Sequence, residues 1–99
     1  MTIDYCLKNK DEAEFNQLML DTGLCVEVKE GEGKEATVAI VPADYTILID
    51  RIGPITIGDK TYPEYYSNLR LLTDPTEKQV EMLAKYAIDP SQPQYRTWL

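Results

Sequence analysis

The chain has 99 residues, of which 43% are hydrophobic, and its 10 basic and 17 acidic residues give a formal net charge of −7. This length predicts one domain, residues 1–99, with a single core. The charge argues against binding to nucleic acid, because Lys and Arg side chains make the phosphate contacts of such proteins. No stretch approaches the roughly 18 consecutive apolar residues of a membrane helix, so we expect no membrane partner.

The N-terminal sequence MTIDYCLKNKDE lacks the apolar run of a signal peptide. The two cysteines, Cys6 and Cys25, do not have the close spacing of paired metal ligands. We therefore expect two reduced thiols in a cytoplasmic protein.

The acidic residues are concentrated in the N-terminal third of the chain. Between residues 11 and 35 there are eight acids and two bases, which gives that segment a charge of 2 − 8 = −6. The simple interpretation is a solvated surface that keeps a small protein soluble. The alternative is an acidic surface that mimics DNA.

The segment KNKDEAEFNQLMLDTGLC predicts a helix over residues 11–22. Asp11 is placed to cap it, with Glu14 as the capping-box acid, and Gly23 suits the left-handed position after its end. Apolar spacing predicts a core-facing stripe, formed by Phe15, Leu18, Met19 and Thr22.

Alternating apolar residues from Leu24 to Val28, a Gly-rich break and a second β-prone run up to Pro42 predict a hairpin. Gly31 and Gly33 form a lone GxG followed by a strand, which favours a turn over a phosphate-binding loop. Further strands are predicted at 45–52, ending at Gly53-Pro54, and at 65–72, with a hairpin turn at Gly58-Asp59.

Thr73-Asp74-Pro75-Thr76-Glu77 predicts a second helix over 75–87, with Asp74 as its cap and Glu77 as the capping-box acid. The stripe expected to pack on the sheet consists of Val80, Leu83, Ala84 and Ala87. Asp89-Pro90 ends this helix, and residues 88–99 form an extended C-terminal tail. Together the elements predict an α+β fold: a small antiparallel sheet, built from residues 24–72, with two helices packed on it.

The chain has no histidine, so it lacks the commonest general base and the commonest metal ligand. Asp50 and Glu64 could form an acid–base pair. Asp44 and Asp50 could bind a cation if the fold supplied more oxygen ligands. The sequence spacing does not identify either pair as functional partners. The acids, with Arg51, are more typical of turn and strand stabilisation. We therefore predict no catalytic residue, no cofactor and no metal.

Tyrosine is frequent, with seven residues in the chain. In an alternating strand, one of Tyr65 and Tyr66 is expected to point inward and the other outward. Because Tyr, Arg and Trp dominate protein–protein contacts, a Tyr-rich and C-terminal interaction surface is the functional interpretation. The residues of this predicted surface are Tyr62, Tyr65, Tyr66, Arg70, Tyr95, Arg96 and Trp98.

The segments IDRIGPI, NLRL and YRTW, in this order, resemble a group of small proteins encoded in tailed-phage and prophage genomes near tail-module genes. The resemblance implies a phage context without a defined molecular activity. We therefore expect a non-enzymatic protein that acts by contact with a phage or host protein in virion tail assembly, either in the host cytoplasm or within the virion. An acidic inhibitor of a host nucleic-acid-binding protein is the alternative, and the predicted surface also suits a homodimer.

Overall fold

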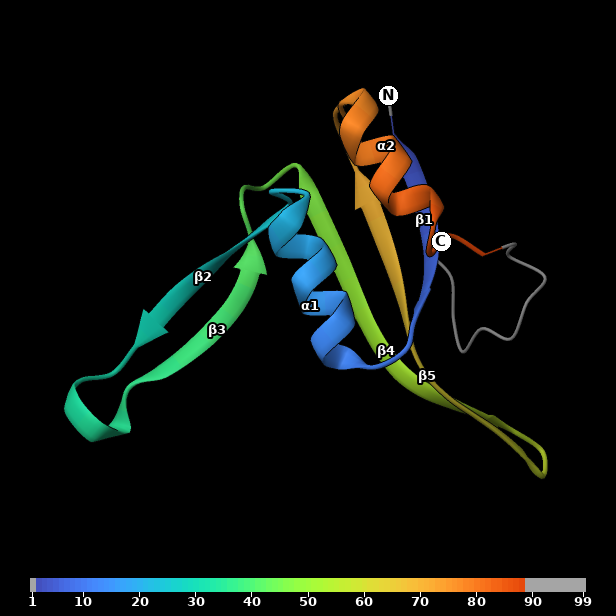
Figure 1. Ribbon diagram of the computed structural model, residues 1–99, viewed down its shortest axis with the longest axis horizontal. Helices are drawn as coiled ribbons and strands as arrows, with labels where there is room; N and C mark the ends of the chain where they lie inside the picture. Colours follow the sequence, from blue (N-terminus) through green and yellow to red (C-terminus); the bar gives the residue numbers. More distant parts are fainter. Residues whose placement is uncertain (1, 89–99) are drawn as a thin grey trace.

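The protein consists of two antiparallel sheets and two helices, in a computed structural model that describes residues 2–88. The elements in chain order are β1 (Ile3–Asn9), α1 (Glu12–Asp21), β2 (Cys25–Glu30), a 3-10 turn (Gly33–Glu35), β3 (Thr37–Pro42), β4 (Ile47–Ile57), β5 (Lys60–Leu71) and α2 (Glu77–Ala84). The predicted α+β class is confirmed. Figure 1 shows the β2–β3 hairpin projecting away from the sheet formed by β1, β5 and β4. Neither helix between residues 2 and 88 is long and apolar enough to cross a membrane.

Helix α1 lies where the sequence predicts it. Asp11 Oδ1 accepts a hydrogen bond from the Glu14 backbone N–H at 2.9 Å, which confirms the N-cap. The Glu14 carboxylate instead accepts from the Lys10 backbone N–H at 2.9 Å, so the expected capping box is not formed. Gly23 follows the helix with φ of +77°, as expected for a left-handed residue. All members of the predicted core stripe are buried: Phe15, Leu18, Met19 and Thr22.

The prediction of a sheet built from residues 24–72 is incomplete, because one strand lies outside this region. Strand β1 forms one edge of the three-stranded sheet, in the order β1-β5-β4, and pairs antiparallel with the central strand β5 from Ile3↔Leu71 to Asn9↔Tyr65. The strands β2 and β3 form a separate two-stranded sheet. The predicted hairpin is therefore present, but it does not extend the main sheet.

Strand β4 does not end at Gly53-Pro54, as the sequence suggests, but continues to Ile57. Its register against β5 shifts on both sides of Gly53, whose φ is +81°. Glycine adopts this left-handed conformation without a Cβ clash, and the irregular register accommodates Pro54 within the strand. The ladder then closes at the predicted Gly58-Asp59 turn.

Both helices pack on one face of the three-stranded sheet. The core on this face combines residues of α1 with alternate residues of β1 and β5, such as Leu7 and Leu69, both fully buried. Helix α2 adds Leu83, which is also fully buried. The two helices therefore lie side by side over the sheet, and their facing surfaces define the space between them.

Helix α2 is shorter than the predicted 75–87 and begins at a different cap. Thr76, not Asp74, is the N-cap: its hydroxyl accepts from the Gln79 N–H at 3.1 Å, and the Gln79 side chain accepts from the Thr76 N–H at 2.9 Å. The buried stripe of this helix also differs from the predicted one. Val80 and Ala84 are exposed, whereas Met82 and Tyr86 pack beside Leu83 against the core.

The end of the described chain returns to β1. Ala87 forms an antiparallel bridge with Leu7, and the Ile88 N–H donates to the Cys6 C=O at 2.7 Å. Ala87 therefore pairs with β1 and does not lie on the buried stripe of α2. Residue 88, which the sequence assigned to the extended tail, is also hydrogen-bonded to β1. The remainder of the predicted tail, residues 89–99, lies outside the described residues.

Candidate functional site

The predicted interaction surface is only partly exposed. Tyr65 and Tyr66 are both buried, so the expectation that one of them points to solvent is wrong. Strand β5 is the central strand, which gives both of its faces neighbours from β1 and β4, and the Tyr65 ring lies 5.3 Å from the Phe15 ring of α1. Burial is the main cause that raises the pKa of Tyr66, and the charge of Glu64 raises it further.

The other predicted interaction residues are dispersed. Tyr62 is half-buried, with the Lys60 ammonium 5.0 Å from its ring. Arg70 forms a two-pronged ion pair with Asp4 on β1, at 2.8 and 3.0 Å. The hydrogen bond from Arg70 lowers the pKa of Asp4 and raises that of Arg70 itself. The predicted C-terminal members of the surface, Tyr95, Arg96 and Trp98, lie outside the described residues.

Arg51 has a structural position that agrees with its interpretation as a stabilising residue. Its guanidinium donates to Asn16 Oδ1 of α1 at 2.8 Å, to the Tyr65 hydroxyl at 3.4 Å and to the Ile40 carbonyl of β3 at 3.4 Å. It also lies 4.9 Å from the centre of the Phe15 ring. Arg51 therefore joins α1, the main sheet and the projecting hairpin.

The free thiols differ in their surroundings. Cys6 is half-buried and Cys25 is buried at the base of the hairpin. Burial raises the pKa of the Cys25 thiol, and the positive charge of Arg51 opposes this effect without cancelling it. Cys25 is therefore a poor candidate for a nucleophile or a metal ligand, both of which require the thiolate.

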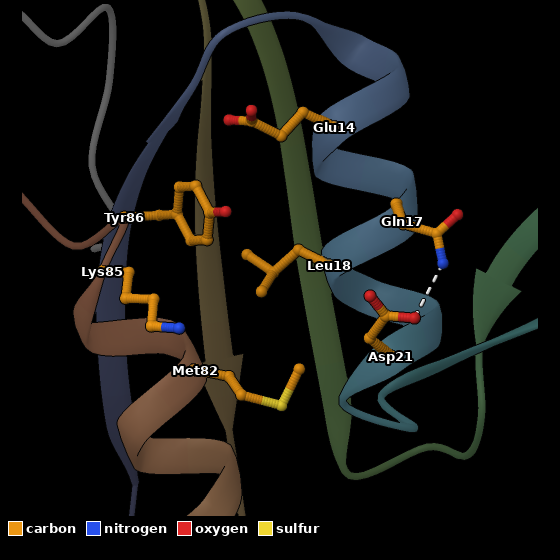
Figure 2. Close-up of a pocket in the computed structure, with 7 residues that line it drawn as sticks. All are labelled: Glu14, Gln17, Leu18, Asp21, Met82, Lys85 and Tyr86. Atoms are coloured by element: carbon orange, nitrogen blue, oxygen red, sulfur yellow. Dashed lines mark hydrogen bonds between the residues drawn. The ribbon is translucent and has the colours of Figure 1, made fainter.

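One hollow lies between the two helices (Figure 2). It has a volume of about 210 Å³, and the side chains of Leu18 and Met82 face one another across it. Its polar lining consists of Glu14, Gln17, Asp21, Lys85 and Tyr86. The carboxylates already have partners: Glu14 accepts from the Lys10 N–H, and Asp21 accepts from Gln17 at 2.7 Å. Both carboxylates in this lining therefore already accept hydrogen bonds from neighbouring residues.

Two further hollows are similar in size. One, of about 170 Å³, lies near Asp44 and Asp74, and the other, of about 240 Å³, lies between α1 and β3 beside Arg51. All three volumes are below the roughly 300 Å³ at which small-molecule sites usually begin.

The carboxylates of the described residues do not gather the oxygen ligands that a cation site would need. Hydrogen bonds from the Thr46 hydroxyl and backbone N–H to Asp44 lower the pKa of that carboxyl, and Asp44 closes a local turn. Within residues 2–88 there is no group of three or more Cys, Asp or Glu side chains that could hold a metal ion.

The most prominent exposed feature is the β2–β3 hairpin, which the sequence analysis predicts only as a structural element. Val26 and Val28 of β2 lie on one face, with relative exposures of 44% and 38%, and their cross-strand partners are Val41 and Ala39 of β3. We call these four residues the hairpin apolar face. Tyr45, in the loop after β3, is 87% exposed. The apolar alternation that predicts the strand also indicates which residues form this face. The sequence alone does not show whether another element covers the face.

Comparisons with known proteins give no indication of the function of this chain. No protein-family model, no curated protein and no solved structure matches the chain. The function is therefore inferred from the residues and their geometry.

Proposed function

We propose that this chain is a non-enzymatic protein that acts by protein–protein contact, with the β2–β3 hairpin as its contact element. The observation that supports the proposal is the hairpin apolar face, in which Val26 and Val28 are exposed and Ala39 and Val41 are half-buried. A two-stranded hairpin on its own is marginally stable in water, and unpaired strand edges are sites at which other chains bind. Such a projecting, apolar element gains stability when a partner covers it.

The hairpin is held in position for such contact. Arg51 fixes β3 to α1 and to the main sheet, and the Ala43 N–H donates to the Leu24 carbonyl at 2.9 Å at the hairpin base. A contact element that is held in place loses less conformational entropy on binding than a mobile segment does. The partner is a phage or host protein, and the resemblance of IDRIGPI, NLRL and YRTW to phage-encoded proteins suggests virion tail assembly as the setting.

The test is affinity capture of the tagged protein from phage-producing cells, followed by mass spectrometry. The double variant Val26→Ser, Val28→Ser should lose the captured protein, because it removes the apolar contact while leaving both strand backbones intact. Val80→Ser is the matched control, since Val80 lies on α2 and has a similar exposure of 42%. Equal recovery of the same protein by all three forms would contradict the proposal.

The second candidate, an acidic inhibitor of a nucleic-acid-binding protein, is favoured by a different observation. The acids of α1 and the hairpin are largely exposed, including Glu12, Asp21, Glu27 and Glu30. Contact through these acids would weaken strongly as salt rises, because exposed charges are screened over about 8 Å at physiological ionic strength. Contact through the hairpin apolar face would persist in high salt. Repeating the capture in high salt therefore separates the two candidates.

A further inference from the structure

The outer edge of β2 is a row of unpaired backbone groups. On one side β2 pairs with β3, and on the other side no described residue forms a backbone hydrogen bond with residues 26–30. Every residue in that range is exposed. In Figure 1 the hairpin extends away from the helices and the main sheet, so the edge is open to another chain. An exposed strand edge of this kind is a template for a further strand.

The base of the hairpin shows which backbone groups point outward. The Ala43 N–H donates to the Leu24 carbonyl, so Leu24 and Ala43 form a hydrogen-bonded pair. Hydrogen-bonded and non-hydrogen-bonded pairs alternate along an antiparallel ladder. By this alternation, Glu27 and Lys29 occupy non-hydrogen-bonded positions against β3. Their N–H and C=O groups therefore point to the open edge.

The charges at these two positions select a second copy of the chain as the occupant. We propose that β2 pairs antiparallel with β2 of another copy, about a two-fold axis at Val28. This axis places Glu27 of each copy opposite Lys29 of the other, with their outward backbone groups facing one another. An axis at Glu27 would place two glutamates opposite each other, and an axis at Lys29 would do the same with two lysines. Opposite charges across a strand pair stabilise it and like charges destabilise it, so the axis at Val28 is favoured.

The net charge of −7 opposes association, and three of the acids, Glu27, Glu30 and Glu32, lie in the hairpin itself. Exposed charges are screened within about 8 Å at physiological salt, whereas the Glu27–Lys29 pairs are in direct contact. The pairing joins two hairpins into one sheet, in the order β3-β2-β2-β3, and brings their hairpin apolar faces together on one side. This inference rests on the proposed function, because it takes the hairpin as the contact element and specifies its first partner.

The test measures the dissociation constant of the full-length protein by sedimentation over a range of concentrations. Glu27→Lys and Lys29→Glu should each weaken the dimer by about tenfold or more, because each replaces two attractive pairs by two repulsive ones. An equimolar mixture of the two variants should restore dimers, since one variant has two positive and the other two negative side chains at the pair. Lys34→Glu is the control: it makes the same charge change in the exposed turn, outside the paired strand.

The outcomes are distinct. A protein that stays monomeric at high micromolar concentration overturns the inference. So does a dimer that responds equally to Lys29→Glu and Lys34→Glu, and so does a mixture of the two variants that fails to recover dimers. If another protein is still captured and lost with Val26→Ser, Val28→Ser while the full chain is monomeric, the proposed function stands and only the self-pairing fails.

Discussion

Arg51 is the residue on which the position of the hairpin depends. Its contacts come from α1, β3 and β5, which are distant in sequence, and they combine hydrogen bonds with stacking on Phe15. Arginine suits this role because its planar guanidinium donates in several directions while one face covers an aromatic ring. Lysine could not replace it, since a single ammonium group cannot reach all of these partners.

Substitution of Arg51 tests this role. Arg51→Met keeps most of the aliphatic stem but removes the hydrogen bonds and the charge, and we expect a loss of about 1–3 kcal/mol in the free energy of unfolding. Urea denaturation followed by circular dichroism measures it. Lys60→Met is the control, because Lys60 also lies over an aromatic ring but at the exposed β4–β5 tip, and its loss should stay within about 0.5 kcal/mol. Equal losses in both variants would show that Arg51 does not join the elements as described.

At the scale of the elements, the N-cap Thr76 determines where helix α2 begins. The reciprocal Thr76–Gln79 bonds fix its first turn, and the Gln79 amide also donates to the Thr22 carbonyl at the end of α1, at 2.8 Å. One side chain therefore serves both the start of α2 and its attachment to α1. This double role explains why the helix begins after Pro75 and not at it.

The cap gives a direct comparison between the sequence expectation and the structure. Thr76→Ala should lower the free energy of unfolding by about 1 kcal/mol, because it leaves the Gln79 N–H without its acceptor. Asp74→Ala, at the position that the sequence suggested, should change it by less than about 0.5 kcal/mol. Thermal and urea unfolding of both variants provide the measurement. A larger loss from Asp74→Ala than from Thr76→Ala would mean that Asp74 is the cap.

Local signals predict the elements whose stabilising bonds are local. Asp11 and Gly23 mark α1 correctly, and Gly58-Asp59 marks a turn, because each acts on backbone groups within a few residues. Strand β1 has an equally local signal in the alternation of Tyr5 and Leu7, and that signal could have identified it. The cap of α2 also has a local signal, because Thr76 and Gln79 have the Ser/Thr-x-x-Glu/Gln spacing of a capping box, and this spacing could have distinguished Thr76 from Asp74.

The exposed surface is harder to predict, because it depends on which strands pair. The burial of Tyr65 depends on the packing of α1, whose Phe15 ring lies 5.3 Å away, and the exposure of Val26 reflects that no third strand among the described residues lies beside the hairpin. Neither fact is local to those residues. The sequence therefore identified aromatic residues as the contact surface, whereas the structure presents an aliphatic hairpin face and keeps two of the tyrosines in the interior.

At the scale of the whole molecule, stability should decrease from the main sheet to the projecting hairpin. Strand β5 is paired on both sides and contributes Tyr65, Leu69 and Leu71 to the core, while β2 is paired on one side and exposed from Val26 onward. Regions with few buried apolar contacts open more often than the core does. The hairpin is thus expected to open more often than the three-stranded sheet.

Amide hydrogen exchange measured by NMR can show both this gradient and the proposed self-pairing. In dilute protein, amides of β5 should exchange slowest, the β3-bonded Val28 amide faster, and the outward Glu27 and Lys29 amides fastest. At concentrations that favour the dimer, Glu27 and Lys29 should become protected to about the level of Val28, because their N–H groups then donate to the second copy. Lys29→Glu should abolish this concentration dependence. Protection of Glu27 and Lys29 in dilute monomer would instead show that their groups do not point to the open edge, and the proposed register would then be wrong.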